Sequence, residues 1–218
     1  FYALSYIADY VWVTRQDMKA EKMKRHKAQF EYLKLKQQVN PHFLFNSLNV
    51  LDCLICENKN EDASLFVHKL SGMYRYMLKN EIDTLIPLRD ELAFVGMYTD
   101  LLKVRFSCGF EVRTDVPEEF MSFQVVPCSI QMLVENALKH NRVSPGNPLY
   151  IDMVAKDNRF IVTNTISPRM ASSEESTKVG LNYIRQQYID LSGNDIEVID
   201  DGKTYSVSLP LLPVQKTT

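Results

Sequence analysis

Two stretches of this 218-residue chain repeat apolar side chains at helical spacing, and this feature limits the possible folds more than any other. In residues 44–55 and 66–77 the apolar positions advance by four, three and four residues, which marks one face of a helix. Further apolar and aromatic residues broaden the stripes: Phe43, Val50 and Leu54 on the first, Leu65 and Tyr74 on the second. The polar turn 58–61 makes the two helices a hairpin. Because stripes this broad exceed what one partner helix can cover, we expect two copies to form a four-helix bundle, and therefore a homodimer.

The remainder of the chain mixes helical and strand patterns. Helices are expected at 91–104, 129–140 and 181–191, and strands rich in Val, Ile, Phe and Tyr at 110–114, 150–155, 160–164, 196–200 and 204–209. Tight turns at 156–159 and 200–203 predict two strand hairpins. The Ser-rich segment 167–178 predicts a long loop, of the kind that covers a binding site. The fold class predicted is α+β, with a helical hairpin followed by an α/β sandwich.

The beginning of the chain indicates where it works. Residues 1–13 are apolar and aromatic, and residues 15–36 carry eight Lys and Arg against three Asp and Glu. This order is typical of the cytoplasmic end of a membrane span, although a full crossing needs about 20 residues. Because the chain begins with Phe1, we expect it to follow a membrane or sensor segment, as the cytoplasmic portion of a bacterial inner-membrane protein. An ordinary buried helix end followed by a solvated basic face is the alternative.

Several classes of function find no support in the sequence. The net charge of −2 gives no general attraction to nucleic acid, and no direct contact with nucleic acid is expected. Neither a Walker phosphate loop nor a serine-nucleophile elbow is present. The four histidines show no metal-ligand spacing with cysteine or acidic residues, and the four cysteines are expected to be free and mostly buried.

A first candidate site lies in residues 38–49, QVNPHFLFNSLN. Pro41 predicts a helix kink near residues 37–40, because proline removes one helical hydrogen bond and clashes with the preceding turn. His42 follows, and Asn46 lies one turn further on the same face. A neutral imidazole can attack phosphorus, and the amide could orient the ring or a water. A structural histidine in an apolar stretch is the alternative.

A second candidate site lies in residues 124–141, QVVPCSIQMLVENALKHN. Asn136, Lys139 and His140 share one helix face, since they are spaced by three and four residues. An amide oxygen can bind Mg²⁺, and the two basic side chains can hold phosphate oxygens. Glu135 points away by about a third of a turn and is a candidate base or supporting carboxylate. The alternative is a polar helix face with basic residues that the helix dipole favours.

The two motifs resemble those of the LytS/YehU-like sensor histidine kinases, and residues 98–106 (YTDLLKVRF) resemble a segment that the family has between them. The resemblance covers roughly residues 34–210. It implies autophosphorylation on His42 with ATP, a GHKL (Bergerat-type) ATP-binding domain, Mg²⁺ at Asn136 and phosphates at Lys139 and His140. It also implies phosphotransfer to an aspartate of a response regulator, often of the LytTR type.

The remaining nucleotide motifs depart from this family pattern. Asn164 stands where an aspartate usually accepts the adenine amino group, and Ile166 replaces a glycine. In the second glycine box Lys178 replaces the first glycine and Tyr183 an asparagine, while Gly180 remains, at the expected start of a helix. Backbone N–H groups at such a start can hold a phosphate, to which Lys178 could add a charge. Weaker nucleotide binding is one expected consequence.

The sequence thus predicts three parts: a membrane-proximal lead-in (1–38), a dimerisation and phosphotransfer hairpin (39–88) and an ATP-binding domain (89–218). His42, Asn46 and Glu135 are the candidate catalytic residues; the acid that often follows the acceptor histidine is replaced by Phe43. An inactive or weakly active scaffold that works through protein contacts is the alternative function. The input signal, the regulator and the choice between cis and trans phosphorylation stay open.

Overall fold

The structure, a computed structural model, describes residues 41–79, 85–106, 109–168 and 175–214. The chain divides into two compact units, 1–44 and 45–218. The expected lead-in, its basic run and the kink at residues 37–40 lie outside the described residues. Within the described ranges, no helix has the length and apolar character needed to cross a membrane.

The first elements form the expected helical hairpin. Helix α2 spans Pro41–Cys56 and α3 spans Asn60–Lys79. Asn58 takes a left-handed backbone conformation (φ 58°) in the turn between them, which asparagine tolerates better than most residues. The inner faces bury Leu54, Ala63, Phe66 and Met73, each less than 10% exposed. The apolar spacing therefore predicted the hairpin correctly.

A five-stranded mixed sheet follows, with the strand order β2-β4-β5-β7-β6. The strands span Phe110–Asp115 (β2), Leu149–Lys156 (β4), Arg159–Thr165 (β5), Glu197–Asp200 (β6) and Thr204–Pro210 (β7). Strands β2 and β4 are parallel and the other neighbours are antiparallel. Buried and half-buried residues alternate along β4 and β5, as expected of a sheet with one covered face.

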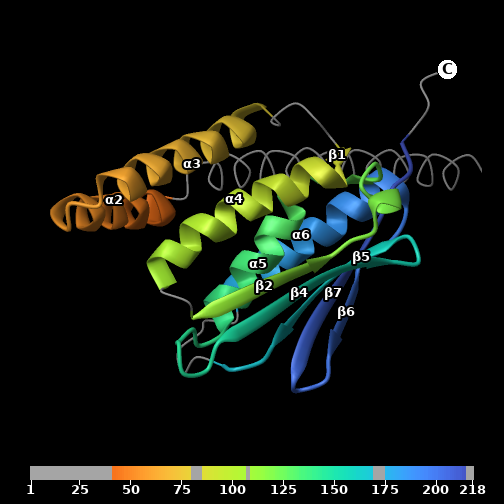
Figure 1. Cartoon of the computed structure of the whole chain (residues 1–218). Coiled ribbons are helices and arrows are strands. Elements are labelled where there is room, and N and C mark those ends of the chain that lie inside the picture. The colour runs from red at the N-terminus through yellow and green to blue at the C-terminus, as the bar shows by residue number, and fades with distance from the viewer. Residues whose placement is uncertain (1–40, 80–84, 107–108, 169–174, 215–218) are drawn as a thin grey trace, which may run out of the picture. The chain divides into compact units, whose positions relative to one another are not determined.

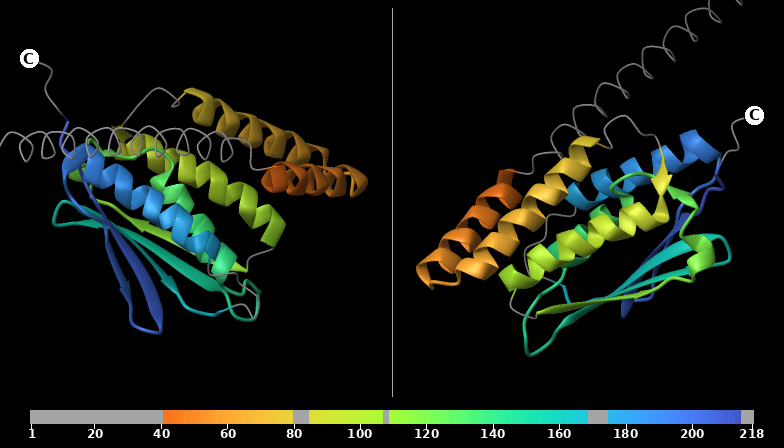
Figure 2. Two further views of the ribbon diagram at one scale, coloured as in Figure 1. Left: turned by 180° about the vertical axis from the view of Figure 1, so that it is seen from behind. Right: turned by 45° about the horizontal axis from the view of Figure 1, so that its top comes forward.

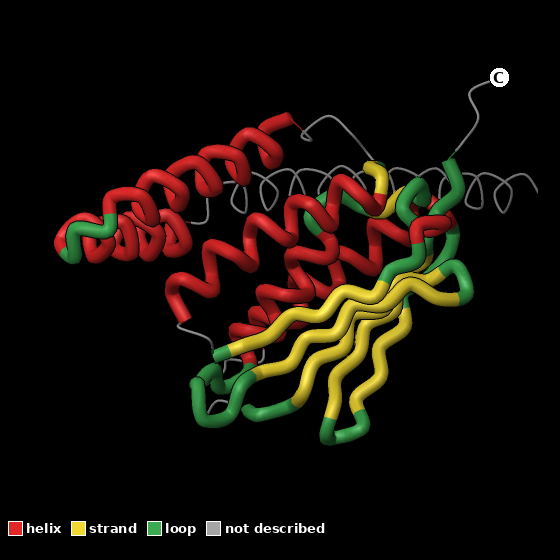
Figure 3. Tube along the Cα trace, viewed as in Figure 1, coloured by secondary structure: helices red, strands yellow, loops and turns green. Residues whose placement is uncertain are grey.

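Three helices cover that face (Figures 1 and 3): α4 (Leu88–Phe106), α5 (Ser129–His140) and α6 (Glu175–Ser192). This arrangement confirms the predicted α+β fold class. Both predicted strand hairpins are also confirmed. Asp157 and Asn158 have positive φ in the first turn, and Gly202 (φ 78°) takes in the second a conformation that glycine adopts without strain.

Some details differ from the sequence prediction. Helix α6 begins at Glu175, so the predicted start at Leu181 was wrong, and Gly180 lies inside the helix. A two-stranded ribbon of β1 (Ile86–Pro87) and β3 (Gln124–Val125), and a 3₁₀ turn at Glu118–Phe120, were not predicted because each is too short to carry a pattern. Cys53 and Cys56 are exposed in the single chain rather than buried, Cys128 is half-buried, and Cys108 lies outside the described residues.

Helix α3 packs against α4, and the two run side by side in both views of Figure 2. Lys69 of α3 forms an ion pair with Asp100 of α4 at 2.6 Å. Further along, the ring of Tyr76 stacks on Phe94, with centroids 4.3 Å apart and planes 11° from parallel. The hairpin helix α3 is therefore in direct contact with the first helix of the sheet domain.

Candidate functional site

Helix α5 carries the second candidate motif and forms the middle of the site. Its apolar side packs toward α4, α6 and strands β4 and β5, with Ile130, Val134 and Ala137 among its buried residues. Asn136 and His140 are half-buried and Lys139 is exposed, so the three predicted ligands lie on the more accessible side. The helix has the bounds expected from the sequence, because the apolar pattern extends over the whole helix and no further.

Helix α6 brings the glycine box close to this face. A Cβ atom at Gly180 would stand 3.4 Å from Cε of Met132 and 4.0 Å from Nδ2 of Asn136. The structure thus brings together two motifs that lie more than 40 residues apart in the sequence. The sequence analysis placed Gly180 at the start of a helix, where its N–H could bind a phosphate. Because Gly180 is inside the helix, its N–H is not available as a helix-terminal donor, and this prediction was wrong. The absent side chain instead leaves room beside Asn136.

The C-terminal end of α5 is tied to the segment that follows β5. The side chain of Asn141, 5% exposed, donates from Nδ2 to the carbonyl of Ala137 (2.9 Å). Its Oδ1 accepts from the N–H of Ser167 (2.6 Å), and the N–H of Arg142 donates to the carbonyl of Ser167 (2.7 Å). The chain after the candidate adenine residue is therefore held against the helix with the candidate Mg²⁺ ligand.

Asn164 lies near the end of β5 and is 6% exposed. Its Nδ2 donates to the carbonyl of Thr165 at 2.8 Å, so Oδ1 is the atom that could accept from an adenine amino group. The replaced glycine position, Ile166, continues the strand pairing, since its N–H donates to the carbonyl of Lys203. The aspartate-to-asparagine change therefore keeps an acceptor and loses a charge.

Glu135 is half-buried and lies near Tyr98 of α4. Gln131 donates to its Oε2 at 3.0 Å. Burial raises the pKa of Tyr98 on α4, and the nearby Glu135 carboxylate raises it further. Its role as a base is a prediction that nothing in this geometry tests.

The acceptor motif lies at the start of α2. His42 is the second residue of that helix, in the first compact unit, whereas Asn136 lies in the second. The side chains of His42 and Lys178 lie outside the part that the structure describes. Asn46 is half-buried, and within the described residues its Nδ2 is buried without a hydrogen-bond partner. An unpaired buried amide donor is unfavourable, so this group is a candidate for a water or a substrate oxygen.

Sequence reasoning missed Glu91, an acidic residue in the first turn of α4 that is fully buried. Its Oε1 accepts from the N–H of Ile130 (3.1 Å), and its Oε2 accepts from the N–H of Cys128 (3.0 Å) and the hydroxyl of Tyr76 (3.2 Å). Burial raises the pKa of this carboxyl to about 7, although the hydrogen bonds act against the shift. An acidic residue in the first turn of a helix is usually solvated. The signal that could have found Glu91 is its spacing, three residues after Leu88 and four before Val95, which places it on the apolar stripe of α4.

Comparisons with known proteins find similarity to histidine kinases. Residues 30–110 match the family model described as histidine kinase. The sensor protein LytS of Enterococcus faecalis is 29% identical over 198 residues, which cover 80% of this chain and 33% of LytS. The sensor histidine kinase BtsS of Escherichia coli is 38% identical over 120 residues, which cover 55% of this chain and 21% of BtsS.

Sensor histidine kinases are thus among the proteins that this chain resembles. The resemblance that the motifs indicated is thereby confirmed, and the matched range includes His42, the hairpin and α4. The chain spans about a third or less of these curated relatives. Among solved structures, the cytoplasmic segment of histidine kinase QseC aligns with a TM-score of 0.43 and 17% identity, over 62% of this chain and 82% of that one.

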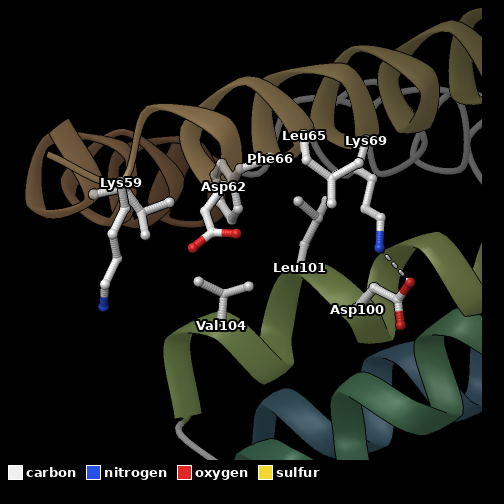
Figure 4. Close-up of a pocket in the computed structure, with 9 residues that line it drawn as sticks. Lys59, Asp62, Leu65, Phe66, Lys69, Asp100, Leu101 and Val104 are labelled. Carbon is white, nitrogen blue, oxygen red and sulfur yellow. Dashed lines mark hydrogen bonds and ion pairs between the residues drawn. The ribbon is translucent and has the colours of Figure 1, made fainter.

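The chain also has a pocket away from the predicted site. A cavity of about 290 Å³ lies between the turn end of the hairpin and α4, and Leu65, Phe66, Leu101 and Val104 supply apolar walls (Figure 4). Lys69 and Asp100 pair at its edge. Because no residue of the predicted site lines this pocket, its position neither supports nor opposes the nucleotide assignment. Within the described residues, no cluster of three or more His, Cys, Asp or Glu could hold a metal ion.

Proposed function

We propose that the chain is the catalytic portion of a sensor histidine kinase, which phosphorylates its own His42 with ATP and passes the phosphoryl group to an aspartate of a response regulator. The observation that carries the proposal is the approach of Gly180 to Asn136, which joins two candidate nucleotide motifs on neighbouring helices. The relationship to LytS and BtsS supports the same reaction.

Each residue on the accessible side of α5 has a role in this proposal. Asn136 supplies an amide oxygen to Mg²⁺, whose other positions go to phosphates and water. The ion, when bound, neutralises charge on the transferred phosphate. Lys139 and His140 hold phosphate oxygens, Asn164 accepts from adenine, and Lys178 and Gly180 border the phosphates. Because the proposed site has one protein amide as a metal ligand, Mg²⁺ would take most of its ligands from the nucleotide and water.

The chemistry consists of two phosphoryl transfers. An unprotonated ring nitrogen of His42 attacks the γ-phosphorus, and the new P–N bond forms as the bond to the oxygen shared with the β-phosphate breaks and ADP leaves. In the second transfer an aspartate carboxylate of the regulator attacks, so a P–O bond forms and the P–N bond breaks. Asn46, four residues after His42 in the sequence, orients the ring or a water in this proposal. Glu135 is the candidate base.

We propose a homodimer through the exposed apolar side of the hairpin. Phe45, Leu48 and Ile55 are between 48% and 66% exposed in the single chain. Two copies that bury these residues make the four-helix bundle expected from the sequence. The domain division at 38/39 and 88/89, a LytTR-type regulator and a position on the cytoplasmic side of the inner membrane belong to the same proposal.

A scaffold with weak or no ATP turnover is the second candidate function. The observation in its favour is Tyr183, which replaces an asparagine of the glycine box. Burial raises the pKa of this phenol to about 12, so it remains a neutral ring where a small polar amide is usual. Such a protein keeps the dimer and its partner contacts but transfers no phosphate.

A labelled γ-phosphate ATP assay separates the two candidates. The parent chain and its His42→Gln variant are incubated with Mg-ATP, and the product is tested for acid lability, which is typical of phosphohistidine. Acid-labile label on the parent alone supports the kinase. A folded, dimeric parent that takes up no label and binds no fluorescent ATP analogue at millimolar concentration favours the scaffold. Label on His42→Gln contradicts the acceptor assignment. Asn136→Ala is expected to lose Mg-ATP binding and keep the dimer.

A further inference from the structure

The carboxylate of Glu91 is a meeting point of three helices. Glu91 itself belongs to α4, the N–H groups of Cys128 and Ile130 belong to the start of α5, and the hydroxyl of Tyr76 comes from α3. None of these residues is among the candidate ligands of nucleotide or metal. Their arrangement joins the hairpin that carries the acceptor motif to the helix that carries Asn136.

The start of α5 depends on this carboxylate for its cap. The N-cap residue, Cys128, has a left-handed backbone (φ 60°), and its side chain makes no capping hydrogen bond. Helix N-termini leave N–H groups that need acceptors, and they favour negative charge. Glu91 supplies the acceptor oxygens and the negative charge, although it belongs to α4 and has no exposure to solvent.

The third donor comes from the hairpin. The ring of Tyr76 stacks on Phe94, one turn from Glu91 along α4, and this contact aims the hydroxyl at Oε2. Burial and the Glu91 carboxylate both raise the pKa of Tyr76, so the phenol remains protonated and donates. A hydrogen bond with this geometry exists only while α3 keeps its position along α4.

We propose that Glu91 is a positioning residue which, with Tyr76, holds the first turn of α5 in register with α3, so that a displacement of the hairpin moves Asn136. Only the effect on nucleotide binding rests on the proposed function. The hydrogen-bonded contact between α3, α4 and α5 does not depend on it. Asn136 lies six residues beyond Ile130, about 9 Å along a continuous helix, and a helix transmits a shift of its first turn over that distance.

We call the hydrogen bonds from Tyr76, Cys128 and Ile130 to Glu91 the link. The link responds to protonation of Glu91, because an ionised carboxylate accepts all three hydrogen bonds and a protonated one has less accepting capacity. The groups that face it are Tyr76 from α3, Cys128 before α5 and Tyr188 from α6, with Asp90 beside it on α4. The hydrogen bond from Tyr76 lowers the pKa of Glu91 and so favours the ionised form. Removal of the Tyr76 hydroxyl therefore raises the pH at which the link is lost.

The test compares Tyr76→Phe and Glu91→Gln with Tyr74→Phe in the full chain. Tyr74 lies on the same helix, and among the described residues its buried hydroxyl has no hydrogen-bond partner, so it is a matched control. Hydrogen exchange is followed by mass spectrometry on peptides over residues 126–133 without nucleotide. Affinity for a fluorescent ATP analogue with Mg²⁺ is measured from pH 5.5 to 8.5.

For Tyr76→Phe we expect exchange at the start of α5 to accelerate by about tenfold, as for one lost hydrogen bond to a charged group, while the sheet is unchanged. The acid-side midpoint of nucleotide affinity should move to higher pH, and Tyr74→Phe should match the parent in both. Equal acceleration over the whole sheet, or an unchanged pH midpoint in a chain that binds ATP, overturns the inference. Should the parent bind no ATP, the proposed function fails, and the exchange experiment alone still decides the link.

Discussion

The side-chain oxygen of Asn141 accepts a hydrogen bond of 2.6 Å from the backbone N–H of Ser167, 26 residues further along the chain. The same side chain also donates to the carbonyl of Ala137, so one buried amide satisfies two backbone groups. It fixes where the chain leaves β5 relative to the last turn of α5.

Replacement of Asn141 by alanine should therefore destabilise the fold by about 1–3 kcal/mol, because the N–H of Ser167 is left without its acceptor. Denaturation by urea measures this change. Asn147→Ala, at an exposed position, is the control and should stay within about 0.5 kcal/mol of the parent. Equal stabilities for the two variants would show that water replaces the Asn141 side chain without loss.

Gly180→Ala should separate nucleotide binding from stability. A Cβ atom there makes an ordinary contact with Met132, so the fold is kept, and the gain in helix propensity is about 1 kcal/mol. The same atom occupies space beside Asn136, and the affinity for Mg-ATP should fall several-fold in a titration with a fluorescent analogue. Gly96→Ala in α4, where a Cβ would meet nothing within 4 Å, should gain stability and keep its affinity. Unchanged affinity in Gly180→Ala would remove this glycine from the site.

The double variant Leu48→Lys with Ile55→Lys should be a folded monomer. Both side chains are about half exposed in the single chain, so the charges cost little there and much in a dimer interface. Sedimentation measures the molecular mass, and circular dichroism checks the helices. The control is Ile199→Lys, on an exposed position of β6, which should leave the dimer intact. A dimeric double variant would place the interface elsewhere.

The carboxyl of Glu91 makes stability depend on pH. Its pKa of about 7 in the folded chain lies above the ordinary value of 4.5, so the folded state holds a proton that the unfolded state has lost between these values. This contribution is fully present below pH 4.5 and is lost as pH rises through about 7, with a size of up to about 3 kcal/mol. Denaturation from pH 4.5 to 8 should show this decline for the parent and a flatter profile for Glu91→Gln. Parallel profiles would contradict the assignment.

The sequence predicted the elements whose patterns are long and regular. The hairpin helices, α5 and the strands on either side of the turn at Asp157 and Asn158 all follow from spacing or turn chemistry. Helix α6 was placed too late because Ser and Glu residues before Gly180 read as a loop, although they can also begin a helix.

The candidate site was harder to predict than the fold. The helix face of Asn136 and its two basic neighbours follows from spacing alone, but its closeness to Gly180 depends on how α5 and α6 pack. Glu91 was missed because an acidic residue is expected at the surface, although its spacing from Leu88 and Val95 places it on the buried stripe of α4. Local patterns identify which residues share a face, and only the packed structure identifies which faces meet.

The parallel pairing of β2 with β4 bears on the order in which the chain folds. Strand β4 meets β5 across a two-residue turn, whereas Phe110 meets Leu149 only after the intervening α5 segment has crossed over. Closure of a long loop is slow compared with a tight hairpin. In pulse-labelled refolding the amides of β4 and β5 should gain protection before those of β2, so that the sheet grows toward this edge and is completed there last.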